Sequence, residues 1–498
     1  MKEIVFSLQR YIALFLFVIV FVACGQESIE KQFPTQELLE DVEVLQAQLQ
    51  KYHPGLYTYT SKKDMDAAFD SIRTQLQEPL DAIDFYRRLL PLHNKIRNGH
   101  TFIIPSEVWS KAAEANLFHF PFDIYWDDRA LYLLRNFSAN TEISVGSKII
   151  SINGIKASEV YWKLVEGWTK DGFNTTFPEK IVHQDFSEFY LNSFGSFETF
   201  DLEIEQHGIR VHYQVAGMPI SAIREMAKRR YNFDKLPWYN DNSDTSFHFS
   251  MKDQNAFMTL PTFNIDVIKD NKTDYESFFK SCFTAIEEKE ISNLVIDIRG
   301  NGGGHGDVAS ELFSYLHKEP FTLIKDIYAI ANKIEDKKMY QGKISSVNLQ
   351  MKLGLNKVGA SKYVPKKAAA KKNHLTLGDR NPSFPNFNGQ VIIVMDGWSF
   401  SASGMFTALM TKRDNTIFVG EEAGGNPHTQ VGDFEQMLVL PNSKVRIRIP
   451  LLVQYMDVDF ENNGHGVLPD YPVRNSIQQE MNNQDAVMDF VMDLLLVQ

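Results

Sequence analysis

Cysteine is scarce in this sequence, and its scarcity excludes a fold held together by disulfides. The 498 residues include 2 cysteines, Cys24 and Cys282. Cys282 has Phe279 and Phe283 as near neighbours, so we expect it to be a small buried core residue. If Cys24 is modified, as its surroundings indicate, no disulfide can form within the chain.

The apolar run at the N-terminus, Tyr11–Val22, is short for a membrane span. Basic residues precede this run, and small residues lead from it to Cys24. That order is typical of a lipoprotein signal peptide, here residues 1–24, with the acyl chains attached to Cys24. We therefore expect an exported protein with a lipid anchor in the bacterial cell envelope, on its periplasmic or outer-membrane face. A plain N-terminal membrane helix is the alternative, and it would also export the rest of the chain.

The chain also lacks an excess of basic residues. It has 51 Lys and Arg against 63 Asp and Glu, which gives a net charge of −12. Binding to nucleic acid requires a basic face, so this balance excludes DNA or RNA as the expected partner. The basic segment at 362–372 reads as a solvated loop.

Several motifs that would indicate other chemistry are missing. The sequence has no Gly-Lys-Ser/Thr phosphate loop, no GxGxxG, and no HExxH pair of metal ligands. The serines near residue 400 do not match the GxSxG elbow of α/β-hydrolases. We therefore expect neither a cofactor nor a metal.

Apolar spacing divides the rest of the chain into three modules. Residues 32–104 show helical periodicity, and the last helix is expected to run from about Ala82 to Arg97, with a kink at Pro91 and Gly99 placed to end it. Residues 115–217 read as strands, and within them Ile143–Val160 resembles the middle of a PDZ domain, an ordinary hairpin being the alternative. Residues 218–498 alternate buried strands with helices, which predicts a mostly parallel α/β sheet.

Two loops of this last module carry residues suited to acyl transfer. The sequence GWSFSASG, Gly397 to Gly404, lies between a buried strand and a helix, where free N–H groups favour a developing oxyanion. Serines that merely cap the helix are the alternative. The sequence DIRGNGGG, Asp297 to Gly304, follows the neighbouring strand, and its glycines let the backbone approach a ligand closely.

The two loops together resemble the tail-specific (C-terminal-processing) serine proteases, which show similar "DLRxNxGG" and "SASASE" segments. The sequence GHGVLPD from Gly464, and segments around His53 and His100, resemble further parts of exported bacterial members. The resemblance implies a crotonase-like catalytic core, a peptide or protein substrate, and Ser401 as the nucleophile. It also implies oxyanion donors at Ala402 and in the glycine run, at Gly302 or Gly303.

The chain departs from the family at the base. Many members use a lysine that would fall on position 426, which is Asn426 here. The tricorn-like branch uses a histidine and a supporting carboxylate instead, and these fall on His100 and Glu461. A neutral imidazole can act as a base at physiological pH. Alternatives remain for both roles, namely His428 and His465 for the base and Glu422, Asp457 and Asp459 for the carboxylate.

The expected activity is thus that of a serine-type endopeptidase, with acyl transfer to Ser401 followed by hydrolysis. Two alternatives share the fold. Retinoid-binding proteins of the eye resemble this family yet bind hydrophobic ligands, so the chain could be a non-catalytic carrier of such a ligand or of a peptide. An esterase acting on small acyl substrates would use the same site.

Overall fold

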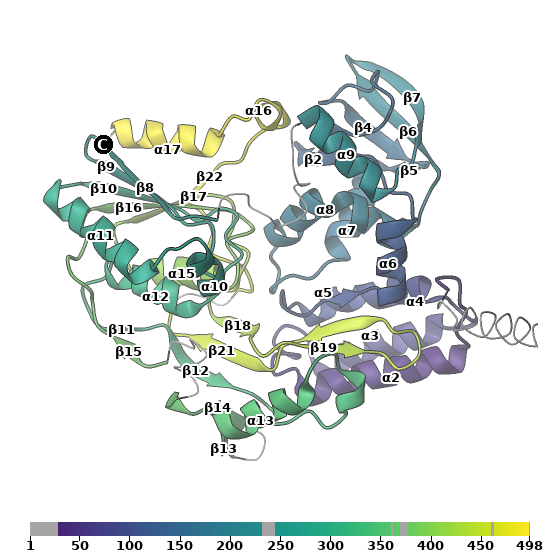
Figure 1. Ribbon diagram of the computed structural model, residues 1–498, viewed down its shortest axis with the longest axis horizontal. Coiled ribbons are helices and arrows are strands. Elements are labelled where there is room, and N and C mark those ends of the chain that lie inside the picture. The colour runs from purple at the N-terminus through teal and green to yellow at the C-terminus, as the bar shows by residue number, and fades with distance from the viewer. Residues whose placement is uncertain (1–27, 232–244, 360–361, 369–376, 460–462, 498) are drawn as a thin grey trace, which may run out of the picture.

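The computed structural model describes residues 28–231, 245–359, 362–368, 377–459 and 463–497. The expected signal peptide, Cys24 and Glu461 lie outside these residues. Within the described ranges, no helix is both long and apolar enough to cross a membrane. Figure 1 shows the N-terminal helices at the lower right, a β-rich region above them, and a second sheet with its helices on the left.

The N-terminal region is helical, and its apolar residues pack into one core. Ser61 caps the second helix as the sequence pattern predicts, because its Oγ accepts the backbone N–H of Asp64. The third helix, expected over about residues 82–97, is interrupted at Pro91 and ends at Ile96, where Arg97 rather than Gly99 takes the left-handed conformation with a φ of 52°. The elements are α2 (Thr35–Tyr52), α3 (Lys62–Gln75), α4 (Ala82–Leu89), η1 (Leu90–Leu92) and α5 (His93–Ile96), then β1 (Ile103–Ile104) and α6 (Glu107–Ala115).

The second region is an antiparallel sheet with helices packed on it. Its strand order is β2-β3-β4-β6-β7, with β5 paired to β4. Asn153 and Gly154 form the turn between β4 and β5 with φ values of 50° and 77°, the conformation that Asn-Gly favours. The elements are β2 (Phe122–Asp127), β3 (Ala130–Asn136), β4 (Lys148–Ile152), β5 (Ile155–Lys156), α7 (Ala157–Glu166), α8 (Thr176–Phe194), β6 (Thr199–Gln206), β7 (Ile209–Ala216) and α9 (Ile220–Tyr231).

The third region contains a sheet of order β22-β17-β16-β10-β9-β8, in which the neighbouring strands are parallel except for the antiparallel pair β8 and β9. Its central strands are buried on both faces, as their continuous apolar sequences predict. The strands are β8 (His248–Lys252), β9 (Asn255–Thr259), β10 (Asn293–Asp297), β16 (Gln390–Met395), β17 (Thr416–Gly420) and β22 (Tyr471–Pro472).

Helices cover both faces of this sheet. One face packs against the main core, which includes Cys282 as the sequence predicts. The other face packs against the C-terminal helix, through Val487 and Val491 (Figure 1). The helices are α10 (Ile265–Asp270), α11 (Tyr275–Glu288), α12 (Gly306–Ser314), α15 (Ala402–Met410), α16 (Ile477–Met481) and α17 (Ala486–Val497).

Smaller sheets connect the third region to the first. Strand β1, from the N-terminal region, pairs with a hairpin far along the chain, Ile103 with Ile447. This pairing joins the segment just before β1 to the hairpin of β19 and β20. The remaining elements are β11 (Phe321–Thr322), β12 (Ile324–Tyr328), η2 (Lys337–Met339), α13 (Ile344–Gly354), β13 (Leu355–Val358), β14 (Lys362–Pro365), β15 (Asp379–Arg380), β18 (Thr429–Gly432), β19 (Gln436–Val439), β20 (Arg446–Ile449) and β21 (Leu452–Met456).

Candidate active site

Ser401 occupies a strained turn between β16 and α15. Its φ of 55° and ψ of −125° lie in a region that residues with a side chain rarely adopt. Holding a residue there costs about 1–3 kcal/mol, and such residues cluster at functional sites. The turn places the Ser401 hydroxyl at the N-terminus of a buried helix, where backbone N–H groups lack intrahelical acceptors.

The glycine loop and the serine loop are tied together at the carboxyl ends of two adjacent parallel strands. Asp297 of β10 lies opposite Val394 of β16. The carboxylate of Asp396 then accepts the N–H of Gly300 at 3.1 Å, and Asn301 O accepts the N–H of Phe400 at 3.2 Å. The two motifs found in the sequence therefore form a single rigid unit.

Three regions of the chain fix the short loop that carries His100. Asp171 accepts the backbone N–H of Gly99 at 2.7 Å. The Asn98 amide donates to the carbonyl of Val431 in β18 at 3.0 Å, and Thr101 bonds to His53 of the helical region at 2.7 Å. Gly99 is required there, because a Cβ would lie 2.6 Å from the ring of Phe400.

This loop brings His100 into contact with the serine. His100 Nε2 lies 3.2 Å from Ser401 Oγ, although the two residues are 301 positions apart in the sequence. The imidazole packs against the ring of Phe400, with the ring centroids 4.7 Å apart. On another side of the ring, a Cβ at Gly432 would approach it to 3.4 Å, so a glycine there leaves room for the imidazole.

Burial controls the ionisation of His100. The side chain is 8% exposed, and burial lowers the pKa of His100 to about 4, with Glu435 opposing this shift and Arg448 adding to it. Burial raises the pKa of Glu435, but the charge of His100 when it is protonated and the ion pair with Arg448 at 2.8 Å hold this pKa below its usual value. His100 is therefore neutral at physiological pH and able to accept a proton at Nε2.

The Nδ1 of His100 has no hydrogen-bond partner in the part of the chain that the structure describes. Gln430 Nε2 lies 3.5 Å from the other nitrogen, Nε2, at the outer limit of a hydrogen bond. The carboxylate of Glu435 therefore influences the imidazole through its charge rather than by direct contact.

Ser401 and His100 lie in the wall of a cleft of about 630 Å³. Aromatic side chains make up much of this wall, and the charged residues are gathered near His100. Such a mixture of apolar walls and a few polar groups is typical of substrate sites. The aromatic residues are Phe102, Trp168, Phe177, Trp398 and Phe400.

The expected oxyanion donors lie beside Ser401, but they are not equivalent. The N–H of Ala402 is the first of helix α15 and has no intrahelical acceptor. The N–H of Gly302 makes no hydrogen bond with a described residue. The N–H of Gly303 donates to Asn301 Oδ1 at 2.9 Å, so the N–H of Gly302 is the more available of the two expected glycine donors. Gly303 also allows close packing: at its φ of 93°, a Cβ would lie 2.6 Å from the carbonyl of Phe400.

The alternative residues named from the sequence lie elsewhere. His465 Nδ1 bonds to Glu422 at 3.1 Å, and neither lines the cleft. His428 does not line the cleft either. Asp457 is ion-paired to Lys412 at 3.1 Å, and Asp459 is exposed.

Two carboxylates near His100 were not found by sequence reasoning. Glu435 follows β18, and nothing in its local sequence separates it from the many other acids of the chain. Asp171 is buried, and burial raises the pKa of Asp171 to about 6, although the N–H groups of Gly99 and Asn426 lower it. Both acids meet His100 only through long-range packing, which no local pattern reveals.

A serine on a strained turn, a neutral histidine in contact with its hydroxyl, and free N–H groups beside it define a serine hydrolase on a mixed α/β fold. Comparison with protein families narrows this class from hydrolases to peptidases. Residues 255–473 match peptidase family S41. No curated protein matches the sequence.

Two solved structures of CPAF have a fold similar to that of this chain. Mature CPAF complexed with lactacystin is 13% identical, with a TM-score of 0.60, over 92% of this chain and 97% of that one. Mature CPAF alone is also 13% identical, with a TM-score of 0.58, over 92% and 96%. A putative peptidase from Parabacteroides merdae is 13% identical, with a TM-score of 0.44, over 93% and 97%.

Residues 255–473 are therefore a domain of peptidase family S41, the tail-specific proteases, and the chain is a serine-type peptidase that acts on peptides or proteins.

Proposed function

We propose that the chain cleaves polypeptides through an acyl-enzyme at Ser401, with His100 as the general base. The observation that carries this proposal is the distance of 3.2 Å between His100 Nε2 and Ser401 Oγ. As Oγ attacks the scissile carbonyl, its proton passes to Nε2, and the imidazolium then gives that proton to the leaving amine. A water molecule, deprotonated by His100 Nε2, then attacks the ester carbonyl of the acyl-enzyme, and the proton returns to Ser401 Oγ as the carboxylic acid product leaves.

The oxyanion of the tetrahedral intermediate is held by the N–H groups of Ala402 and Gly302. Glu435 is a carboxylate that stabilises the imidazolium; Glu461, which the family resemblance implies for this role, lies outside the described residues. Its support is electrostatic: Glu435 acts to raise the pKa of His100, so it favours the charged form that appears in the transition state. The ion pair with Arg448 holds this carboxylate in place.

The proposed peptidase consists of three domains. Residues 32–104 form the helical domain that supplies His100, residues 115–217 a PDZ-like domain, and residues 218–498 a crotonase-like core. The turn at Asn153 and Gly154, followed by α7, supports the PDZ-like assignment. The short apolar run before Cys24 supports export and a lipid anchor in the cell envelope.

A carrier of hydrophobic ligands would also suit the aromatic walls of the cleft. A carrier, however, has no need for a strained serine in contact with a neutral histidine. The contact between these two side chains is what favours a peptidase, since an unactivated serine is a poor nucleophile.

A fluorophosphonate probe tests this function. The protein is incubated with the probe, digested and analysed by mass spectrometry. We expect one adduct, on the peptide that contains Ser401, and none in Ser401→Ala. An unmodified Ser401 in folded protein would reject the proposal in favour of a ligand carrier.

A further inference from the structure

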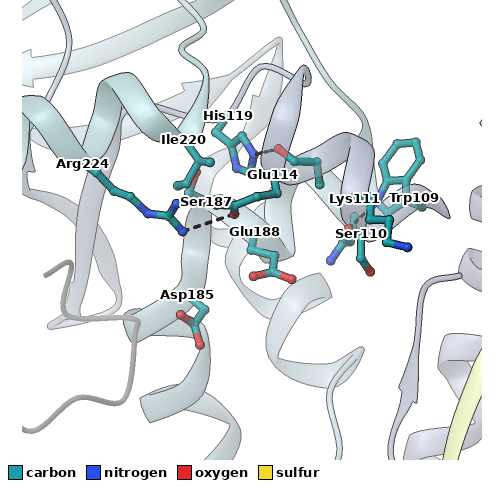
Figure 2. A pocket seen from close by; sticks show the side chains of 12 residues that line it. Trp109, Ser110, Lys111, Glu114, His119, Asp185, Ser187, Glu188, Ile220 and Arg224 are labelled. Atoms are coloured by element: carbon teal, nitrogen blue, oxygen red, sulfur yellow. Dashed lines mark hydrogen bonds and ion pairs between the residues drawn. The ribbon is translucent and has the colours of Figure 1, made fainter. Parts of the chain in front are cut away.

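A second cavity, of about 690 Å³, lies apart from Ser401 and shares no lining residue with the catalytic cleft. It is bounded by α6, α8 and α9, and Figure 2 shows the side chains that face it. Nothing in the peptidase mechanism uses this cavity, although one of its walls belongs to a helix that also reaches the cleft. We refer to it as the α6–α8–α9 pocket.

Acidic side chains outnumber the available basic ones in this pocket. Glu114 is held by Arg224, which contacts both of its carboxylate oxygens, and Lys111 is paired with Glu107 at 2.7 Å. Asp185 and Glu188 form no ion pair with any residue in the described ranges. Figure 2 shows their carboxylates facing the space below Arg224.

A buried histidine in the same wall adds an unsatisfied acceptor. His119 is 4% exposed, and its Nε2 lies 2.9 Å from the carbonyl of Ala113, so Nε2 carries the proton. Its Nδ1 then has a free lone pair, for which the described residues offer no donor. Buried polar atoms without a partner are rare in folded proteins and call for an explanation.

Carboxylates and a lone pair together suit a ligand that is cationic and rich in N–H donors. An ammonium or guanidinium group has both properties. A metal ion is a poorer fit, because the described residues contain no group of three or more side chains placed to hold one. Asp185 is half-buried in the pocket wall, and burial raises the pKa of Asp185, as expected for a carboxylate that lacks a positive partner, whereas Glu188 is exposed at the mouth of the pocket.

Helix α8 connects this pocket to the catalytic cleft. Ile181 lines the cleft, while Asp185 and Glu188 line the pocket, at positions i, i+4 and i+7 of one helix. The helix is kinked at Asp185, where φ is −121° and ψ is 27°. Seven residues of a straight helix rise about 10 Å, so Ile181 and Glu188, on either side of the kink, are separated along α8 by at most about this distance, which an extended peptide spans with about three or four residues.

We propose that the α6–α8–α9 pocket binds a lysine or arginine side chain of the polypeptide substrate, a few residues from the bond that is cleaved. The proposal rests on the proposed peptidase function. It gives the enzyme a second point of recognition, because the pocket selects for a basic residue while the aromatic cleft holds the residues next to the scissile bond.

The test measures peptide binding to full-length Ser401→Ala, so that it does not depend on catalysis. The probes are fluorescein-labelled peptides of one neutral sequence in which lysine is placed at each position in turn, with norleucine as the uncharged match. Fluorescence anisotropy should show about tenfold tighter binding for lysine at one or two positions. Asp185→Asn with Glu188→Gln should abolish that preference, since each amide keeps the shape and removes the charge.

Glu225→Gln is the matched control, because it removes a charge from the exposed side of α9, outside the pocket, and should leave the preference intact. Melting temperatures confirm that each variant is folded. No lysine preference at any position, or a preference that survives the double variant, would overturn the proposal. A third outcome would also overturn it: the parent binds spermidine tightly, the double variant does not, and no peptide position shows a lysine preference. That result would indicate a site for free amines.

The two proposals can fail separately. If a fluorophosphonate leaves Ser401 unmodified but the lysine preference persists and depends on Asp185 and Glu188, the peptidase proposal fails and the pocket remains a site for basic peptide side chains.

Discussion

The catalytic cleft and the α6–α8–α9 pocket are alike in several respects that are often used to find an active site. Their volumes are about 630 and 690 Å³, and each has a buried histidine whose Nδ1 lacks a partner among the described residues. Burial lowers the pKa of both His100 and His119. The difference lies in the neighbour of the imidazole: His100 contacts the hydroxyl of Ser401, whereas His119 contacts a backbone carbonyl. A reaction centre is therefore identified by what the base touches, rather than by cavity size or a perturbed pKa.

Removing the hydroxyl of Ser401 should have the largest effect on activity, because contact with this hydroxyl is what distinguishes His100 from His119. Ser401→Ala should lower kcat/KM on a peptide substrate by about 10⁵-fold or more, as loss of a nucleophile does in other serine peptidases. The measurement is hydrolysis of a quenched fluorescent peptide, with the melting temperature as a check of folding. Residual activity within tenfold of the parent would mean that another residue is the nucleophile.

The charge of Glu435 is expected to be a second difference between His100 and His119, because this carboxylate stabilises the protonated form of His100. Glu435→Gln should lower kcat about 10- to 100-fold, because the imidazolium loses its nearby carboxylate in the transition state. In the parent, kcat/KM should rise with pH through about 4, the pKa to which burial lowers His100, and then stay level to neutral pH. The rising limb should move to lower pH in Glu435→Gln.

Glu422→Gln is the control for this experiment, since Glu422 binds His465 and the N–H of Gly466 outside the cleft. Its kcat should change less than about threefold, within the range of a neutral substitution. A larger loss in Glu422→Gln than in Glu435→Gln would assign the supporting carboxylate to Glu422.

Asp171 holds the His100 loop by a buried carboxylate, an arrangement that His119 lacks. Burial raises the pKa of Asp171 to about 6, above its unfolded value, so the folded state binds the proton more tightly. Stability from this group is therefore present at low pH and is lost as the pH rises from about 4 to 6. Asp171→Asn should remove that loss, worth up to about 3 kcal/mol, because the amide oxygen can still accept the N–H of Gly99.

Urea unfolding of the parent and of Asp171→Asn at several pH values measures this effect. The free energy of unfolding of the variant should depend less on pH between 4 and 6. Parallel pH curves for the two proteins would show that Asp171 is not the titrating group.

The smallest effects are expected at the alternative histidines. His428→Ala and His465→Ala should each change kcat/KM by less than about threefold, because neither side chain lines the cleft. Assays of the two variants beside the parent are sufficient. A loss of 100-fold in either one would show that the cleft rearranges when substrate binds.

The secondary structure around Ser401 could be predicted well from the sequence, because strands β10 and β16 are continuous apolar runs and α15 follows directly. The turn of Asn153 and Gly154 was equally clear from turn chemistry. The third N-terminal helix was expected to run to about Arg97, and it ends one residue earlier, at Ile96; the left-handed residue that ends it is Arg97 rather than Gly99. Gly99 is there for close approach to Phe400.

The candidate site was less accessible to sequence reasoning. His100 came from family resemblance, and its position depends on β1 pairing with β20, a contact between distant segments. Glu435 was missed because its field reaches His100 only after the hairpin of β19 and β20 has folded against the helical region. The sequence left Gly302 and Gly303 as equal candidates for the oxyanion donor, and only the three-dimensional structure shows that the side chain of Asn301 accepts the N–H of Gly303.

The rate of labelling by a fluorophosphonate tests most directly whether His100 activates Ser401. His100→Ala should react at least about 10³-fold more slowly than the parent. His317→Ala, which removes a partly buried histidine far from the cleft, should react within about threefold of it. Equal labelling rates for folded His100→Ala and the parent would contradict the account, because the serine would then be reactive without this imidazole.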